Sequence, residues 1–284
     1  MKLFKTLVFK LKNTLNKPTS LNFVKERKQG TYIPKVIHQV YSDSKLPEPL
    51  QSNVNQLKNN NPNWRHHLYD DESMLAYVEQ EFPEIYPYYI KIDQAYCACK
   101  ADLFRYLLIY NEGGVYLDIK SGTNTPLNEI IKSDDLYILA HWPKSNKNTG
   151  HHPAIPNPNG ELQQFHIIAT SGHPFLKAVI DHVCSNINRY NPIIHGPGAS
   201  VMAVSGPIVY TNVITPLINK YPCRLSYNHE ELDIYYSCLE GLHTHYKVYT
   251  KKHYCQLTSP IIKQPFLINS LYYFIYSIKK LLLG

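Results

Sequence analysis

Short apolar runs alternate with longer amphipathic stretches along most of the chain. The apolar runs predict β-strands at 35–40, 64–69, 115–118, 137–140 and 165–169. Helical spacing of apolar residues predicts α-helices at 48–60, 72–80, 94–111, 173–187 and 200–219. Pro62 and the pair Gly113-Gly114 end the first and third of these helices. Strands that alternate with helices indicate an α/β fold, with a mainly parallel central sheet and helices on both faces.

The strand predicted at 115–118 ends on an acidic residue, Asp118. In parallel sheets, ligands bind beyond the carboxyl ends of the strands, so Asp118 marks an expected ligand site. Asp102 and Arg105 lie three positions apart on one face of the preceding helix. Together they offer an acceptor and a fork of donors to ligand hydroxyl groups, although a surface ion pair explains the spacing as well. The long segment 141–160 is predicted to be a functional loop or lid.

Both ends of the chain are apolar and basic. We expect a basic amphipathic helix in residues 1–30, one folded domain over 31–262, and an apolar, basic helix in 263–284. Lysines interrupt the apolar positions of the first segment, which does not fit a cleavable signal peptide. The apolar part of the second, 266–278, is shorter than the ~20 residues of a spanning helix. Each end fits either a membrane surface or the domain's own core.

Composition narrows the class of partner and the location. The net charge is +7, but the basic residues form no long run and no nucleic-acid-binding motif accompanies them. This excludes nucleic acid as the expected partner. The six cysteines form no Cys-x-x-Cys zinc motif, which favours free thiols and a cytoplasmic location, peripheral at a membrane if the ends bind lipid. One disulfide between distant cysteines is the alternative.

Three segments carry a resemblance to a known family. They are Ile33-Pro34-Lys35-Val36-Ile37-His38-Gln39, then Asn61-Pro62-Asn63-Trp64, then residues 101–118. Together they resemble the DXD-containing sugar-binding glycosyltransferases of family GT32, and the last block is similar to the core of the clostridial glucosylating toxins. The resemblance is strong over about residues 31–125. Residues 171–174 and 205–207 extend it more weakly.

The resemblance implies a GT-A fold, which is Rossmann-like, and a UDP- or GDP-sugar donor. It also implies transfer of a hexose, with retention, to a glycan or lipid-linked hydroxyl in polysaccharide or surface-glycan biosynthesis. Asp118 corresponds to the first acid of the family's Asp-x-Asp motif, with Arg105 beside it in the catalytic site. The implied substrate-binding residues are His38, Gln39, Asp102, Arg105, Tyr116, Gly206 and Pro207.

Lys120 departs from the family pattern, because it replaces the second acid of the motif. In the family that acid is a main ligand of Mn²⁺ or Mg²⁺, which prefer oxygen ligands. Three interpretations remain. Lys120 neutralises the leaving diphosphate in place of a metal, or Asp118 holds a metal with His243, His245 or His253, or the protein has become a weakened, sugar-binding or scaffold subunit. A phosphotransferase is disfavoured, since no phosphate-cradling Gly-rich loop is present.

Overall fold

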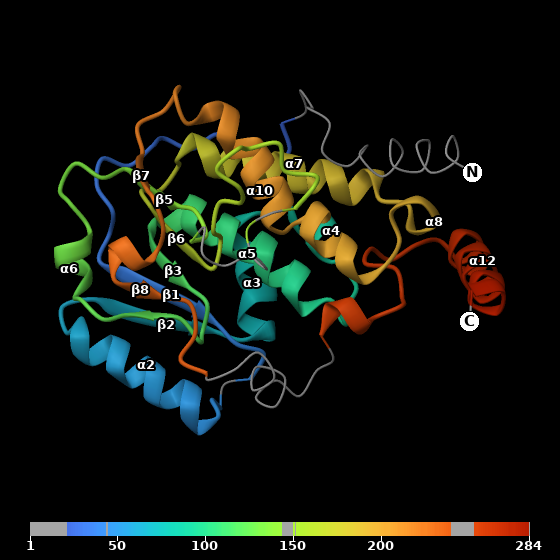
Figure 1. The fold of residues 1–284 in the computed structure, drawn as a ribbon, viewed down its shortest axis with the longest axis horizontal. Helices are drawn as coiled ribbons and strands as arrows, with labels where there is room; N and C mark the ends of the chain where they lie inside the picture. The colour runs from blue at the N-terminus through green and yellow to red at the C-terminus, as the bar shows by residue number, and fades with distance from the viewer. Residues whose placement is uncertain (1–21, 44, 144–149, 151, 240–252, 284) are drawn as a thin grey trace.

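The computed structural model describes residues 22–43, 45–143, 150, 152–239 and 253–283 (Figure 1). At its centre is a six-stranded sheet. The strands, in spatial order, are β2 (Arg65–Tyr69), β1 (Val36–Val40), β3 (Gly114–Leu117), β6 (His166–Ala169), β5 (Tyr137–Ala140) and β7 (Arg224–Ser226). Each of the five predicted strands is therefore present, within one residue at either end.

Most of the neighbouring strands in this sheet run parallel to one another. β1 is parallel to β2 and β3, and β5 is parallel to β7. β6 runs antiparallel to both of its neighbours, β3 and β5. This confirms the expected α/β class, and it agrees with the mainly parallel central sheet between helices that a GT-A fold requires.

Helices cover the two faces of this sheet. The bounds of the helices with five or more residues are α2 (Glu48–Asn60), α3 (Asp71–Glu81), α5 (Cys97–Glu112), α7 (Pro174–Arg189), α10 (Pro207–Ile214) and α12 (Phe266–Leu283). The short helices are α4 (Tyr86–Tyr89), α6 (Leu127–Ile130), α8 (Pro192–His195) and α9 (Val201–Val204). The 3₁₀ turns are η1 (Gly198–Ser200), η2 (Thr215–Leu217), η3 (Glu230–Leu232) and η4 (Tyr254–Gln256). The helix predicted at 94–111 begins later than expected, since the Asp93 carboxylate instead accepts from the backbone N–H of Ala95 in a turn.

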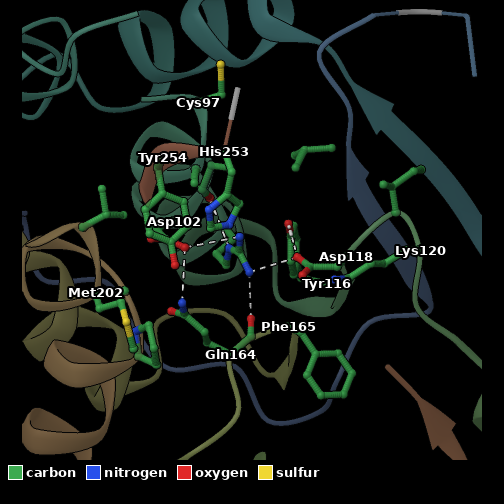
Figure 2. Close-up of a pocket in the computed structure, with 18 of the residues that line it drawn as sticks. Cys97, Asp102, Tyr116, Asp118, Lys120, Gln164, Phe165, Met202, His253 and Tyr254 are labelled. Atoms are coloured by element: carbon green, nitrogen blue, oxygen red, sulfur yellow. Dashed lines mark hydrogen bonds and ion pairs between the residues drawn. The ribbon is translucent and has the colours of Figure 1, made fainter. Parts of the chain in front are cut away.

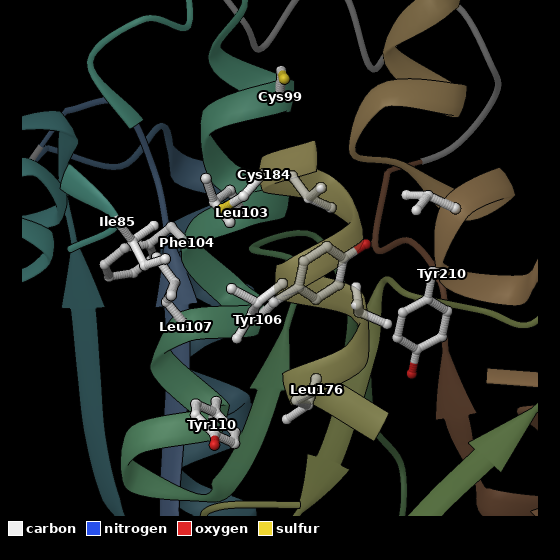
Figure 3. Packing of buried hydrophobic residues seen from close by; sticks show 14 of the residues in the cluster. Ile85, Cys99, Leu103, Phe104, Tyr106, Leu107, Tyr110, Leu176, Cys184 and Tyr210 are labelled. Atoms are coloured by element: carbon white, nitrogen blue, oxygen red, sulfur yellow. The ribbon is translucent and has the colours of Figure 1, made fainter. Parts of the chain in front are cut away.

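The larger hydrophobic core lies between the sheet and helices α3, α5, α7 and α10 (Figure 3). Helix α5 runs through it and is almost wholly buried from Asp102 to Tyr110. A second core packs the opposite face of the sheet against α2 and α6. Consecutive residues of a strand point to opposite faces, so Tyr116 enters the first core while Val115 and Leu117 enter the second.

The turn from α5 into β3 requires two glycines. Gly113 and Gly114 have φ values of 67° and 95°. A Cβ on Gly113 would lie 2.7 Å from the backbone nitrogen of Ser171, and one on Gly114 would lie 2.6 Å from a methyl of Val36. Side chains are therefore excluded by both conformation and space, and this tight turn fixes α5 against β3.

One predicted helix and one predicted boundary are wrong. The helix expected over 200–219 is divided into α9 and α10, because Pro207 has no N–H to continue α9 and instead starts the next helix. Residues 22–30 form neither helix nor strand, so the helix expected over 1–30 does not extend through them; residues 1–21 lie outside the described residues. Val24 is buried and its N–H donates to Asp181 on α7, which places this segment in the main domain.

Short elements complete the fold. β4 (Gly122–Thr123) and β8 (Ile234–Tyr235) pair antiparallel beside the main sheet. The helix expected in 263–284 is α12, at the edge of the molecule in Figure 1. All six cysteines lie among the described residues and no disulfide joins any two of them, which supports the expectation of thiols.

Candidate active site

A pocket of about 630 Å³ opens where β1 and β3 end (Figure 2). Its walls come from the segments after these two strands, the first half of α5, the residues before β6, α9 with the start of α10, and the region around η4. The position is the one that parallel-sheet topology predicts for a ligand.

Three charged side chains form the floor of this pocket, and we call them the carboxylate–guanidinium cluster: Asp102, Arg105 and Asp118. Arg105 Nη1 lies 3.0 Å from Asp118 Oδ1, and Arg105 Nη2 lies 3.3 Å from Asp102 Oδ1. The Asp102 side chain is only 6% exposed, whereas that of Asp118 is 26% exposed. Asp118 is therefore the carboxylate that a ligand can reach, and Asp102 supports Arg105 from within the core.

Neutral groups satisfy the remaining polar atoms of the cluster. The Ser205 hydroxyl donates to Asp102 Oδ2 over 2.9 Å, and the Tyr116 hydroxyl donates to Asp118 Oδ1 over 3.1 Å. Arg105 Nη1 also donates to the backbone oxygen of Gln164 at 2.9 Å. Buried charges are tolerated when such bonds surround them, so the cluster is a rigid, preorganised element.

The environment raises the pKa values of both Asp102 and Arg105, which favours the neutral form of the first and the charged form of the second. Burial raises the pKa of Asp102 to about 6, against the lowering effects of Arg105 and the Ser205 hydrogen bond. Burial by itself would lower the pKa of Arg105, but neighbouring Tyr116 and Asp118 outweigh it and raise that pKa. Arg105 therefore stays charged at all relevant pH values, while Asp102 changes charge near pH 6.

Lys120 lies in the pocket wall beside aromatic rings. Its ammonium is 3.9 Å from the centre of the Tyr236 ring, a cation–π contact. The Tyr236 ring packs edge-on against Trp142 and Phe165, with ring centres 5.1 and 5.0 Å away. Trp142 donates to Glu161, which also lines the pocket. One side of the pocket thus combines flat apolar faces with a cation and a carboxylate, a combination suited to a phosphorylated sugar.

Only some of the expected metal ligands lie in the described part of the chain. No three His, Cys, Asp or Glu side chains are grouped to hold a metal ion within it. Of the expected ligands, Asp118 and His253 line the same pocket. Asp118 Oδ1 already accepts from Arg105 and Tyr116. His243 lies in the stretch 240–252, outside the described residues, as does His245, so metal dependence stays a prediction.

Two of the expected substrate-binding residues lie outside the pocket lining. His38 and Gln39 do not line the pocket, and both are buried within β1, between β2 and β3. Burial, with His67 nearby, lowers the pKa of His38 to about 3, so it is neutral. Gln39 donates to the backbone oxygen of Asp118 and therefore supports that residue from behind.

The other expected residues do meet in the pocket. Tyr116, Gly206 and Pro207 line it, as do Asp102, Arg105, Asp118 and Lys120. Sequence reasoning missed further lining residues, chiefly Tyr41, Ser42, Asp71, Trp142, Glu161, Gln164, Phe165, Met202, Tyr236 and Tyr254. Tyr41 and Ser42 directly follow a predicted strand and could have been found by the same rule that found Asp118.

Comparison with known proteins agrees with this geometry. Residues 47–137 match the family described as "Glycosyltransferase sugar-binding region containing DXD motif". The matched range includes Asp102, Arg105, Asp118 and Lys120. Over residues 47–137 the chain is thus similar to the DXD-containing glycosyltransferases.

Similar proteins include two from Schizosaccharomyces pombe. Inositol phosphoceramide mannosyltransferase 3 is 28% identical over 207 residues, covering 71% of this chain and 50% of the relative. Initiation-specific alpha-1,6-mannosyltransferase is 28% identical over 204 residues, covering 66% of this chain and 49% of the relative. The chain thus spans about half the length of the curated relatives it matches. Among solved structures, the PaToxG glycosyltransferase is similar with a TM-score of 0.48 and 16% identity, covering 77% of each chain.

Proposed function

We propose that this DXD-family chain transfers a hexose from a nucleotide-diphosphate sugar to a hydroxyl group of a glycan or glycolipid. The observation that carries the proposal is the convergence of Asp102, Arg105, Asp118 and Lys120 in one pocket at the carboxyl end of β3. The named relatives are mannosyltransferases, which supports mannose as the transferred sugar. UDP and GDP donors both remain to be tested.

The pocket provides separate positions for the parts of a donor. Tyr41, at the end of β1, offers an aromatic ring to the nucleoside. Asp118 and Arg105 offer an acceptor and donors to ribose or sugar hydroxyls. Lys120, in the pocket wall, offers its ammonium to the diphosphate. Trp142 and its neighbours form the wall facing the acceptor.

In the proposed reaction an acceptor oxygen attacks the anomeric carbon. The carbon–oxygen bond to the diphosphate breaks, and its electron pair leaves with the nucleoside diphosphate. The attack comes from the face that the diphosphate leaves, which gives retention, and the acceptor proton passes to a phosphate oxygen on that face. Lys120 stabilises the charge that develops on the leaving group, and the cluster holds the sugar in place. No enzyme nucleophile is required.

The decisive experiment measures release of nucleoside diphosphate from a panel of UDP- and GDP-sugars, GDP-mannose included, with Mn²⁺ and with EDTA. We expect turnover that persists in EDTA. Lys120→Ala should lower it by a factor of about 10²–10³, whereas Lys120→Asp should make turnover depend on Mn²⁺, since it restores the family's second acid. The matched control is Lys100→Ala, which removes a lysine over Tyr89 outside the pocket.

Other outcomes would overturn parts of the proposal. Wild-type turnover that is abolished by EDTA and restored by Mn²⁺ would show that Lys120 does not replace a metal. If the protein binds sugar nucleotides but turns over none of them, with or without acceptor, it is instead the sugar-binding or scaffold subunit that Lys120 also suggests. Isothermal titration with the same panel separates this case from loss of the site.

A further inference from the structure

Helix α12 presents a row of apolar side chains to the solvent. Leu267, Leu271, Phe274, Ile278 and Leu281 recur at i, i+4, i+7, i+11 and i+14, which places them on one helical face. All five are exposed, Leu267 and Leu281 by 79% and 84%. A patch of this kind is rare on a protein that functions without a partner at that surface.

The opposite side of α12 holds the helix on the protein. Tyr272 is 4% exposed, and its hydroxyl donates to the backbone oxygen of Thr258 over 2.6 Å. The helix contacts α8 and lies beside the body in Figure 1, rather than within it. Of the two interpretations that the sequence left open for this segment, packing of its apolar stripe into the core is therefore wrong.

The charge around α12 identifies the kind of partner. Residues 253–284 contain three lysines, Lys263, Lys279 and Lys280, and no Asp or Glu. Lys279 is exposed on the helix. Lys263 lies just before it, and its N–H donates to the backbone oxygen of Lys91, so two further lysines meet near its start. Anionic headgroups would complement these cations. A second copy of α12 would bring lysines against lysines with no carboxylate to pair them.

We propose that α12 lies flat in the surface of an anionic lipid bilayer, with its Leu267–Leu281 stripe among the acyl chains. The stripe extends over about 21 Å at 1.5 Å per residue, long enough for interfacial binding. Tyr273, which is 43% exposed, suits the headgroup level. No helix in the described ranges is both long and apolar enough to cross a bilayer. Helix α12 is therefore expected to insert parallel to the membrane surface. Its lipid binding does not require the proposed sugar transfer.

The test is co-sedimentation of the full chain with vesicles of phosphatidylcholine alone or mixed with phosphatidylglycerol. We expect binding to the mixed vesicles, weakened by salt. The double variant Leu271→Ser, Phe274→Ser should bind about tenfold more weakly or worse, and Lys279→Glu should weaken binding to the mixed vesicles only. The matched control, Leu225→Ser with Tyr227→Ser, removes exposed apolar area near β7 and should bind normally. Circular dichroism confirms that each variant is folded.

Three results would overturn the proposal. One is absence of wild-type binding to either vesicle. Another is binding that the double variant in α12 leaves unchanged, which would move the lipid contact to another segment. The third is a dimer by light scattering that the double variant dissociates while vesicle binding stays normal, which would make a second copy the occupant of the stripe.

Discussion

The carboxylate–guanidinium cluster and helix α12 depart from the usual distribution of side chains in opposite directions. The cluster places three charged groups at the floor of a pocket, two of them buried, and α12 turns a row of large apolar groups toward water. Around the cluster, hydrogen bonds from Ser205, Tyr116 and Gln164 compensate the loss of water. Nothing in the described residues covers the α12 stripe. The protein itself supplies hydrogen-bond partners for the charges of the cluster, whereas its described residues supply no cover for the apolar stripe. Buried charges and exposed apolar patches are both better indicators of a functional surface than an ordinary core residue is.

The largest effect is expected from a substitution of Arg105, the residue at the centre of the cluster. Arg105→Met should lower the free energy of unfolding by about 3–5 kcal/mol, since it leaves two carboxylates without their shared cation, and it should abolish donor turnover. Urea denaturation and nucleoside diphosphate release measure the two effects. Unchanged stability would show that the cluster is not held together as described.

A second arginine provides the control for that experiment. Arg224 binds Asp135 through two nitrogens, at 2.8 and 2.7 Å, and neither residue lines the pocket. Arg224→Met should cost about 1–3 kcal/mol of unfolding free energy but leave donor turnover intact. A loss of turnover as large as that of Arg105→Met would mean that general destabilisation, not the cluster, explains both.

An intermediate effect concerns pH. The Ser205 hydrogen bond stabilises ionised Asp102 and so lowers its pKa below what burial alone would give. Ser205→Ala should therefore raise that pKa above about 6. If ionised Asp102 is needed to hold Arg105, the acidic limb of the profile of kcat/KM against pH should move to higher pH by roughly one unit. Ser205→Thr, which keeps a hydroxyl, should leave the limb in place, and an unmoved limb in Ser205→Ala would exclude Asp102 as its origin.

The smallest expected effect lies on α12. Leu271→Ser should change the free energy of unfolding by no more than about 0.5 kcal/mol, because Leu271 is already half exposed in the folded protein. The same change at Leu107, fully buried on α5, should cost roughly 3 kcal/mol or more. Thermal or urea denaturation compares the two variants. A large loss at Leu271 would show that the stripe packs against the protein itself.

Sequence reasoning succeeded where the signal is local. The strand at 137–140 is a continuous apolar run, and its bounds agree with the structure. Asp102, Arg105 and Asp118 lie within 17 residues and share one helix-turn-strand unit, so their meeting followed from that unit alone. The break at Gly206-Pro207 was also visible in the sequence, but the apolar residues on both sides outweighed it.

The remaining features depend on distant parts of the chain. β4 and β8 are two residues long each, and they exist because Gly122 pairs with Tyr235 across more than a hundred residues. Gln164 reaches Asp102 over a separation of 62 residues, and Tyr236 reaches Lys120 over a still longer separation in sequence. The sequence pattern within each segment gives no sign of these long-range contacts. The aromatic side of the pocket, formed by Trp142, Phe165 and Tyr236, could therefore not be predicted.

The antiparallel strand β6 has a consequence for how the protein acquires its activity. It joins the group β2-β1-β3 to the pair β5-β7, so the sheet is in two parts until β6 is in place. The residues just before β6 provide the carbonyl of Gln164 to Arg105 and the carbonyl of Phe165 to the N–H of Asp118. Such long-range strand pairing is slow to form. Completion of the sheet therefore also brings these two carbonyls to the cluster, and we expect a mutation that loosens β6 to loosen Arg105 and Asp118 with it.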